Sequence, residues 1–415
     1  MNTIATLNPQ TRRNLGVLFT MGLLFWASLA SLLPTLPPYV KSLGASNQQL
    51  GIVMGSFAIG LLLFRPQMGR LADSRGRKIV LLIGITVAAI APILHLLTQS
   101  ISVLMVIRVF HGLSIAAFTT AYNALVVDVS PPQNRGELIG YMSLVNPIGM
   151  ALGPAIGGYL QEWKGFTPVF VLASCLGVVS LICCSQVQSP PVESHSNEVN
   201  AKTEAFWQLL ISDRIRIPTI TMLLIGLAFG TLATFVPLYI KESGSDLNPG
   251  LFYTSAAIAS FAVRFLAGRA SDRYGRGPFI TIGLACYALS MFLLCIAQTT
   301  PAFLIAGFIE GIGGGTFLPI TIALVADRCH PHERGRVLGL FMSGFDLGIA
   351  LAGPVLGVVA DRIGYRGAFG VASILALAAL IIFLTLGSKN LSQSLRFALG
   401  QSRDAYALPK PMAAK

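Results

Sequence analysis

The amino-acid sequence predicts an all-α membrane protein with twelve transmembrane helices, arranged as two parallel repeats of six helices. Three observations predict this fold. The chain is 54% hydrophobic and only 11% charged, whereas a soluble domain carries about 25% charged residues. Apolar stretches of about 20 residues, the length that crosses a bilayer, recur from end to end. A short basic motif occurs twice, 199 residues apart, as expected for a transporter built from a duplicated half.

The apolar stretches set the number and the limits of the predicted spans. The first follows Arg12-Arg13 and contains the run Ala27–Ala30, so a cleaved signal peptide is an alternative interpretation. The stretch runs on to Pro37 and eleven others follow, so we expect a retained helix. The spans are expected at 15–37, 48–68, 79–98, 102–127, 137–160, 167–187, 217–240, 250–267, 278–298, 302–326, 336–360 and 367–387.

The net charge of +12 is explained by orientation in the membrane. With both termini inside, the inner loops, the central linker and the tails hold 21 of the 29 Lys and Arg residues. The outer loops hold five: Lys41, Lys164, Lys241, Arg362 and Arg366. Cytoplasmic loops carry such an excess of positive charge, so both termini are predicted to be cytoplasmic and nucleic acid is not expected as a partner. The six cysteines show no metal-ligand spacing, so neither a metal site nor a disulfide is expected.

The repeated motif divides the chain into two similar halves. Residues Gly69–Arg77 read GRLADSRGR, and residues Gly268–Arg276 read GRASDRYGR. A polar stretch at 188–216 separates the halves and ends in a short amphipathic segment at 206–211, expected to lie on the inner membrane surface. We therefore expect an N-terminal bundle at 1–187, a cytoplasmic linker at 188–216, a C-terminal bundle at 217–390 and a cytoplasmic tail at 391–415. An even number of spans in each half gives both halves the same orientation.

Three motifs resemble those of the major facilitator superfamily, and the resemblance covers almost the whole chain outside the linker and the tails. Residues Gly69–Lys78 resemble the signature between spans two and three, with Ser74 where that family usually has arginine. Ile107–Gly112 (IRVFHG) resembles the arginine motif of span four, and Gly149–Gly158 (GMALGPAIGG) resembles the span-five motif of the drug–proton antiporter branch. The resemblance implies a transporter that works by alternating access.

The repeated loop and the glycine-rich spans are expected to control movement of the halves. Glycine permits positive φ in a tight turn, so Gly69 and Gly76 are expected to form one around the carboxylate of Asp73. The resemblance implies that this loop gates the inner face; the alternative is a charge cluster that only sets topology. The predicted gating residues are Gly69, Asp73, Gly76, Arg77, Gly268, Asp272, Gly275 and Arg276. Small residues four apart allow close helix packing. By resemblance the halves rock where these residues pack, and the alternative is ordinary helix packing. The residues are Gly149, Gly153, Pro154, Gly157, Gly353, Pro354 and Gly357.

Ionisable residues inside the apolar stretches indicate where the transport chemistry lies. A charge at the centre of a membrane helix costs about 2.5–3.5 kcal/mol on insertion scales, so such residues face protein or a water-filled cavity. Arg65 and Arg264 each lie four residues before a copy of the motif, and we expect them to reach the interface or to pair with Asp73 and Asp272. His95 is expected near the outer interface rather than in a proton relay.

Four ionisable residues break the repeat and are the candidates for proton coupling or substrate binding. Arg108 is matched by Gly307, His111 aligns with Glu310, and Asp346 has no acidic counterpart. By resemblance, Arg108 serves proton coupling or binds an anionic substrate group; the alternative is a structural ion pair. Glu310 and Asp346 are predicted to carry the proton; the alternative for Asp346 is a hydrogen bond to a nearby backbone break. Polar side chains expected to line the cavity are Tyr122, Asn123 and Asn146.

These observations predict a secondary active transporter, most simply a proton-coupled exporter of a small organic or drug-like compound in a bacterial inner membrane. Export of a specific metabolite such as a sugar or a metal-chelating compound is the alternative, followed by proton symport and by a membrane receptor that has lost transport. No nucleotide-binding motif is present, and the run Gly311–Gly315 lacks the Lys-Ser/Thr of a phosphate loop. We expect no enzyme activity, no cofactor, no nucleotide partner and a monomer whose partners are its solute, protons and lipid.

The gating role of the loop predicts that Asp73→Asn leaves membrane insertion intact but shifts the balance between inward-open and outward-open states. The change removes a carboxylate among basic residues without altering the positive charge that orients the chain. Cysteine-accessibility labelling on both membrane faces measures the balance. Unchanged labelling on both faces would contradict the gating role.

Overall fold

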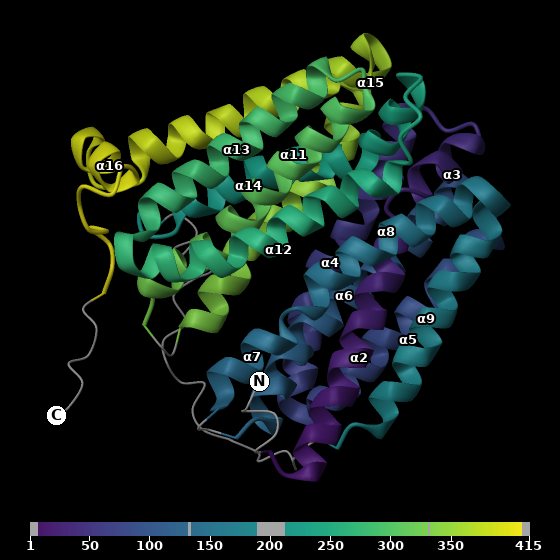
Figure 1. The fold of residues 1–415 in the computed structure, drawn as a ribbon, viewed down its shortest axis with the longest axis horizontal. Coiled ribbons are helices and arrows are strands. Elements are labelled where there is room, and N and C mark those ends of the chain that lie inside the picture. The colour runs from purple at the N-terminus through teal and green to yellow at the C-terminus, as the bar shows by residue number, and fades with distance from the viewer. Residues whose placement is uncertain (1–6, 132–133, 189–211, 331–332, 409–415) are drawn as a thin grey trace.

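The computed structural model describes residues 7–131, 134–188, 212–330 and 333–408, and these residues form helices joined by short turns (Figure 1). The first half contains α2 (Pro9–Ser31), α3 (Leu36–Ser42), α4 (Asn47–Arg75), α5 (Arg77–Leu96), α6 (Ile101–Val129), α7 (Arg135–Met142), α8 (Val145–Lys164) and α9 (Phe166–Gln186). The second half contains α11 (Arg216–Glu242), α12 (Pro249–Tyr274), α13 (Arg276–Ile296), α14 (Thr300–Asp327), α15 (Arg334–Leu386) and α16 (Leu391–Ala398). The amphipathic segment predicted at 206–211 lies outside the described residues.

The described helices supply ten candidate membrane spans, or eleven if α12, bent by 43°, counts as one. The pairs α2–α3 and α7–α8 each form one of these spans. The 53-residue helix α15 contains the non-helical residue Gly364, between the stretches that the sequence predicts as the last two spans. The membrane fold is therefore as predicted, while the count of twelve remains a prediction.

Matching glycines end helices at corresponding points of the two halves. Gly76 and Gly275 have φ of 93° and 94°, and Gly165 and Gly364 have φ of 81° and 74°. This region of φ favours glycine because a side chain would clash there. Each pair is 199 residues apart in the sequence, so the offset of the motif is also the offset of the backbone turns. Gly69 and Gly268 lie inside α4 and α12, and the expected positive φ at Gly69 is therefore wrong.

Polar contacts assign the helix ends to two faces of the molecule. Asn14 donates to the Gln188 carbonyl at 2.7 Å, and Lys78 donates to the Ser185 carbonyl at 2.9 Å. These ends, with the corresponding ends of the second half, form what we call the terminal face. The other end, which we call the distal face, holds Gly44, Gly165, Gly244 and Gly364. There the Asp361 carboxylate accepts from the backbone amides of Asn47 and Gln48 across the two halves.

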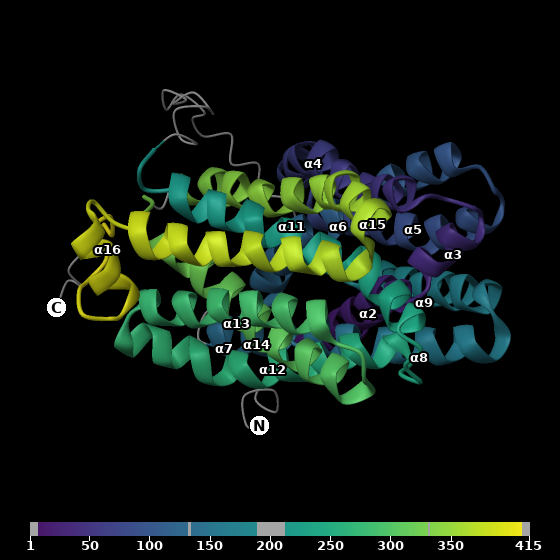
Figure 2. The ribbon, with the colours of Figure 1, turned by 90° about the horizontal axis from the view of Figure 1, so that it is seen from above.

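The two halves pack closely on the distal side and diverge toward the terminal face. Figure 1 shows the two groups of helices together near α3 and the bend of α15, and apart near α7 and α16; Figure 2 likewise shows α16 and α3 at opposite ends. Gly51 of α4 meets Gly353 of α15 backbone to backbone, and Gly250 of α12 meets the Pro154 carbonyl of α8. A Cβ at these glycines would overlap backbone atoms of the other half, so small residues are required there.

The predicted packing motif is only partly a contact between halves. Gly149, Gly153 and Gly157 pack against α2 of their own half. Gly353 and Gly357 of α15 do pack against α4 of the other half. In α8 the contact with the second half comes from Pro154 and Gly158, which lie on the helix face toward α12. Ordinary helix packing, the alternative expectation, therefore holds for Gly149, Gly153 and Gly157, because residues four apart share a single helix face and this face lies against α2.

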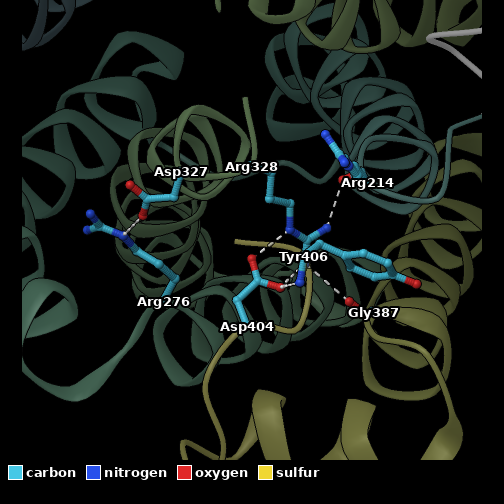
Figure 3. A network of polar contacts seen from close by, with 7 residues as sticks. All are labelled: Arg214, Arg276, Asp327, Arg328, Gly387, Asp404 and Tyr406. Atoms are coloured by element: carbon cyan, nitrogen blue, oxygen red, sulfur yellow. Dashed lines mark hydrogen bonds and ion pairs between the residues drawn. The ribbon is translucent and has the colours of Figure 1, made fainter. Parts of the chain in front are cut away.

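The C-terminal segment to residue 408 is bound to the terminal face of the second half through Arg328 (Figure 3). The Arg328 side chain is 1% exposed and donates from Nε and Nη2 to the Asp404 carboxylate at 2.7 and 2.9 Å. It also donates to the carbonyls of Arg214 and Gly387 at 2.8 and 3.2 Å. One guanidinium therefore joins the start of α11, the end of α14, the end of α15 and the tail, a network that the sequence motifs did not indicate.

We expect Arg328→Gln to release the tail, because Asp404 would lose its bidentate partner and two carbonyls would lose their donor. Breaking a buried ion pair costs about 3–5 kcal/mol. Limited trypsin digestion of the purified protein measures release through faster cleavage at Arg396 and Arg403. Arg336→Gln, an exposed position at the start of α15, is the matched control. Equal cleavage rates in both variants would contradict this role of Arg328.

Candidate functional site

A cavity of about 480 Å³ lies between the two halves and is lined by residues from both. Its wall is mainly apolar and aromatic, and includes Trp26, Met54, Phe57, Phe229, Leu318 and Phe345. Against this wall stand three arginines and two carboxylates: Arg65, Arg108, Arg264, Glu310 and Asp346. An apolar pocket with a few convergent polar groups is the usual form of a small-molecule site. All four proton or substrate candidates named from the sequence, Arg108, His111, Glu310 and Asp346, line it.

Arg65 and Asp346 form an ion pair that joins the halves inside the cavity. The Arg65 Nη1 atom of α4 lies 2.6 Å from the Asp346 Oδ2 atom of α15, and Asp346 is buried. The expectations that Arg65 pairs with Asp73, and that Asp346 stands alone or bonds to a backbone break, are wrong. Asp73 is exposed at the end of α4, where water solvates its charge. A buried carboxylate needs a partner, and it is Asp346 that binds Arg65.

Glu310 is a buried carboxylate held by tyrosine rather than by a cation. Tyr287 of α13 donates its hydroxyl to Glu310 Oε1 at 2.8 Å, and Glu310 forms no ion pair with any described residue. The neighbouring Tyr253 hydroxyl of α12 is buried and has no hydrogen-bond partner among the described residues. A Cβ added at Gly314 would lie 3.5 Å from the carboxylate. The glycine run of α14 therefore provides close packing and space beside Glu310, which agrees with its interpretation as a packing element.

Arg108 lies in the first half, between a phenylalanine and a histidine of the same wall. Its guanidinium carbon is 4.3 Å from the centre of the Phe57 ring, and its Nη1 atom is 3.3 Å from His111 Nδ1. His111 and Glu310 line the same cavity from α6 and α14, and no hydrogen bond or ion pair joins them among the described residues. Arg108 likewise contacts neither carboxylate. Its Nε atom is buried without a partner among the described residues.

His95 lies in the last turn of α5, near the distal face, and is a buried member of the Arg108 cluster. Its ring stacks on Phe170 at 5.6 Å and lies 6.0 Å from the His111 ring, both measured between ring centres. Its Nδ1 atom bonds to the Ala91 carbonyl within α5 at 2.6 Å. Nothing in the sequence near His95 indicated this, because its neighbours come from α6 and α9.

Arg264 faces the cavity instead of pairing with Asp272. Its Nε atom is buried without a hydrogen-bond partner in the part of the chain that the structure describes. Asp272 lies 2.5 Å from Arg276 in the loop itself. Arg264 also borders a second hollow whose lining includes Glu137 and Tyr141. The expected pairing of Arg264 is therefore wrong, and both in-span arginines of the repeat serve the cavity.

Only one of the three predicted polar cavity residues lies in the cavity wall. Asn146 lines it. Tyr122 turns toward α2, where Gly22 leaves room for its ring and its hydroxyl donates to the Leu18 carbonyl at 3.3 Å. Asn123 is exposed on another face of α6. The residues of α6 that extend the wall beyond Arg108 and His111 are Ile115 and Thr119, which fits a spacing of three to four residues along one helix face.

The two copies of the gating motif bind the ends of neighbouring helices within their own halves. Arg77 pairs with Asp128 and donates to the Ala124 carbonyl at 3.1 Å, both in α6. Arg276 pairs with Asp272 and, at 3.3 Å, with Asp327 of α14. Asp73 has no ion pair with a described residue. The loops thus brace corresponding helices in each half, and their gating role remains a prediction.

Comparison with known proteins identifies the family. A sequence profile of the Major Facilitator Superfamily matches residues 18–263 and 219–403. The chain belongs to this superfamily. It is similar to the multidrug resistance protein MdtG of Serratia proteamaculans (strain 568), with 28% identity over 386 residues, 88% of this chain and 92% of that protein. It is also similar to the staphylopine export protein of Staphylococcus aureus (strain Mu50 / ATCC 700699), with 26% identity over 375 residues, 88% and 94% of the two chains.

The fold is that of solved transporters of the superfamily. The crystal structure of the nucleoside transporter NupG superposes with a TM-score of 0.75 at 16% identity, covering 89% of this chain and 99% of that one. As a member of this superfamily, this chain is a multi-pass membrane transporter rather than an enzyme. Among the described residues, no three His, Cys, Asp or Glu side chains lie together as metal ligands.

The ion pair across the halves predicts a coupling between Arg65 and Asp346. We expect Arg65→Gln alone to destabilise the protein, because the change leaves the buried Asp346 carboxylate without its cation. The loss is about 3–5 kcal/mol if Asp346 stays ionised. The double variant Arg65→Gln/Asp346→Asn should recover part of this loss. Thermal unfolding of all four proteins in detergent measures the cycle. Additive losses would show that the two residues do not interact.

Proposed function

We propose that this protein is a secondary active exporter that exchanges a small organic compound for protons by alternating access. The supporting observation is that two buried carboxylates, Glu310 and Asp346, face an apolar cavity lined by both halves. A carboxylate in such a place can exist charged or protonated, and each form has different contacts with its neighbours. The similarity to a protein named for multidrug resistance supports drug-like solutes.

Protonation of Asp346 would weaken the connection between the halves. The ionised carboxylate attracts Arg65 across the boundary of α4 and α15. Once it is protonated this ion pair is lost, and the two helices are free to separate at this level. Loading and release of one proton would then favour different arrangements of the halves, as coupling requires, because a ligand shifts an equilibrium only through its different affinity for the two states.

Glu310 would make proton binding and solute binding exclude each other. The ionised carboxylate accepts the Tyr287 hydrogen bond and attracts a cationic or hydrogen-bonding group of the solute. A proton on the carboxylate removes that attraction. Solute and proton would therefore occupy the cavity in turn, which is exchange rather than co-transport.

The arrangement of the halves fits an inward-open state, in which the cavity is loaded with solute from the cytoplasm. The halves pack at the distal face through Gly51 and Gly353, and diverge toward the terminal face. The terminal face carries most of the basic loop residues, so we assign it to the cytoplasm of a bacterium, with both termini inside the inner membrane. In this state the cavity would bind solute from the cytoplasm. When the terminal ends of the two halves come together, the distal ends would separate and open the cavity to the outside. We take the working unit to be a monomer.

Export of one specific metabolite is the second candidate. It is favoured by the number of charged groups in the cavity and by the similarity to a staphylopine export protein. Proton symport would use the same carboxylates but the opposite solute direction. A receptor without transport would have no need of three arginines and two carboxylates at membrane depth, each of which is costly to bury.

The proposed coupling predicts that Glu310→Gln and Asp346→Asn each lower pH-driven transport at least tenfold, since neither amide can release a proton. A screen of fluorescent amphipathic solutes in inverted membrane vesicles, with an imposed pH gradient, measures transport and its direction. Glu162→Gln, an exposed carboxylate at the distal end of α8, is the matched control. If both cavity variants keep the full pH-driven rate, these residues do not carry the proton.

A further inference from the structure

Arg108 and Glu310, two cavity groups of opposite charge on opposite halves, each lack an ion-pair partner among the described residues. We propose, on the basis of the exporter function above, that the preferred solute is a zwitterionic amphiphile whose carboxylate binds Arg108 and whose separated ammonium binds Glu310. Arg108 belongs to α6 of the first half and Glu310 to α14 of the second. Both side chains line the same cavity and are more than nine-tenths buried, each at 8% exposure.

Arg108 has the free donors that a carboxylate needs. The guanidinium group carries five N–H donors in a planar fork that matches a carboxylate. Only Nη1 has a polar contact, with His111 Nδ1, and Nε is buried without a partner among the described residues. One face of the group is covered by Phe57, which fixes its plane. The arrangement leaves donors directed away from protein partners, as expected of a site that is completed by an anion.

Glu310 and its tyrosines form a matching site for a cation. Tyr287 donates to the carboxylate and holds it in place, while the Tyr253 hydroxyl beside it is buried and unpartnered among the described residues. An ammonium group is attracted both by the carboxylate and by aromatic ring faces. Gly314 keeps the space next to the carboxylate free of a side chain. The second half therefore offers a negative group with aromatic walls.

The balance of charge favours a solute with both signs. Arg65 and Asp346 neutralise each other at 2.6 Å. A purely cationic solute would leave Arg108 uncompensated in a dehydrated cavity, and a purely anionic one would leave Glu310 uncompensated; each is costly. Arg264 is the remaining cation, but it borders a second hollow lined by Glu137 and is less deeply buried than Arg108. We therefore assign the anion contact to Arg108.

Three matched dansyl compounds test this in a binding assay that needs no transport. Nα-dansyl-lysine carries a carboxylate and a separated ammonium, dansylcadaverine lacks the carboxylate, and dansyl-norleucine lacks the ammonium. Trp26 lines the cavity and is the energy donor; Trp163→Phe and Trp207→Phe leave it as the one tryptophan of the chain. Titration of the purified protein in detergent, followed by energy transfer from Trp26 to the dansyl group, gives the three dissociation constants.

We expect Nα-dansyl-lysine to bind roughly tenfold or more tightly than either analogue, the size expected for one charge-assisted hydrogen-bonded contact. Arg108→Gln should abolish the preference for Nα-dansyl-lysine over dansylcadaverine, because it removes the carboxylate contact and the uncompensated cation together. Glu310→Gln should likewise abolish the preference for Nα-dansyl-lysine over dansyl-norleucine. Arg362→Gln and Glu162→Gln, both exposed at the distal face, are the matched controls and should change none of the three.

The inference is overturned if the three compounds bind equally, if none binds detectably, or if Arg264→Gln rather than Arg108→Gln removes the preference for the carboxylate. These results are distinct from failure of the proposed function. Binding that ignores charge, together with proton-driven export of any of the compounds, would refute the zwitterion preference alone. Charge-selective binding without pH-driven transport would refute proton-coupled export and leave the binding site standing.

Discussion

The fold depends on the need to compensate every charge at membrane depth. A buried ion without a partner costs several kcal/mol. The cavity is lined by the side chains of three arginines, one glutamate and one aspartate. The Arg65–Asp346 pair meets this need across the boundary between the halves, so the same contact that neutralises Asp346 also holds α4 against α15. In the proposed mechanism, protonation of Asp346 therefore weakens the contact between α4 and α15. No ion pair compensates Arg108, Arg264 or Glu310 within the described residues, and we propose that the solute compensates Arg108 and Glu310.

The distal packing makes this coupling possible. Where α4 meets α15 and α8 meets α12, glycines bring the backbones together, so the contact has little side-chain bulk to reorganise when the helices pivot. Within each half the terminal ends are braced by larger groups. The motif arginines bind the ends of α6 and α14, and in the second half Arg328 adds the tail to the brace. Two braced halves that meet at a contact with little side-chain bulk can move as rigid bodies, as alternating access requires.

The repeat in the sequence predicted the framework well, because the two halves obey the same local rules. The offset of 199 residues placed Gly76 opposite Gly275, and the structure gives both the same type of turn. It does the same for Gly165 and Gly364, a pair with the same offset that the motifs did not include. The failures have one cause. Arg65 was assigned to Asp73 because the two are close in sequence, and Tyr122 to the cavity because it follows Arg108 along α6. Which partner a side chain meets depends on helices far away in the sequence, Asp346 in one case and Gly22 in the other.

The positions where the repeat fails are also where the site lies, and symmetry explains why. Two identical halves facing a common cavity would present the same charges to each other, and like charges facing across an apolar space repel. Arg108 opposite Gly307, and Glu310 aligned with His111, place a positive charge on α6 and a negative charge on α14, each unpaired among the described residues, whereas Arg65 and Arg264 repeat the same charge in both halves. A solute that spans the cavity then contacts different chemistry on each half. In the proposed mechanism, loss of either contact, by protonation of Glu310 or by separation of the halves, weakens the other, because the solute is held only while both walls are charged and close. The asymmetry proposed to select the solute would therefore also make its release depend on the proton.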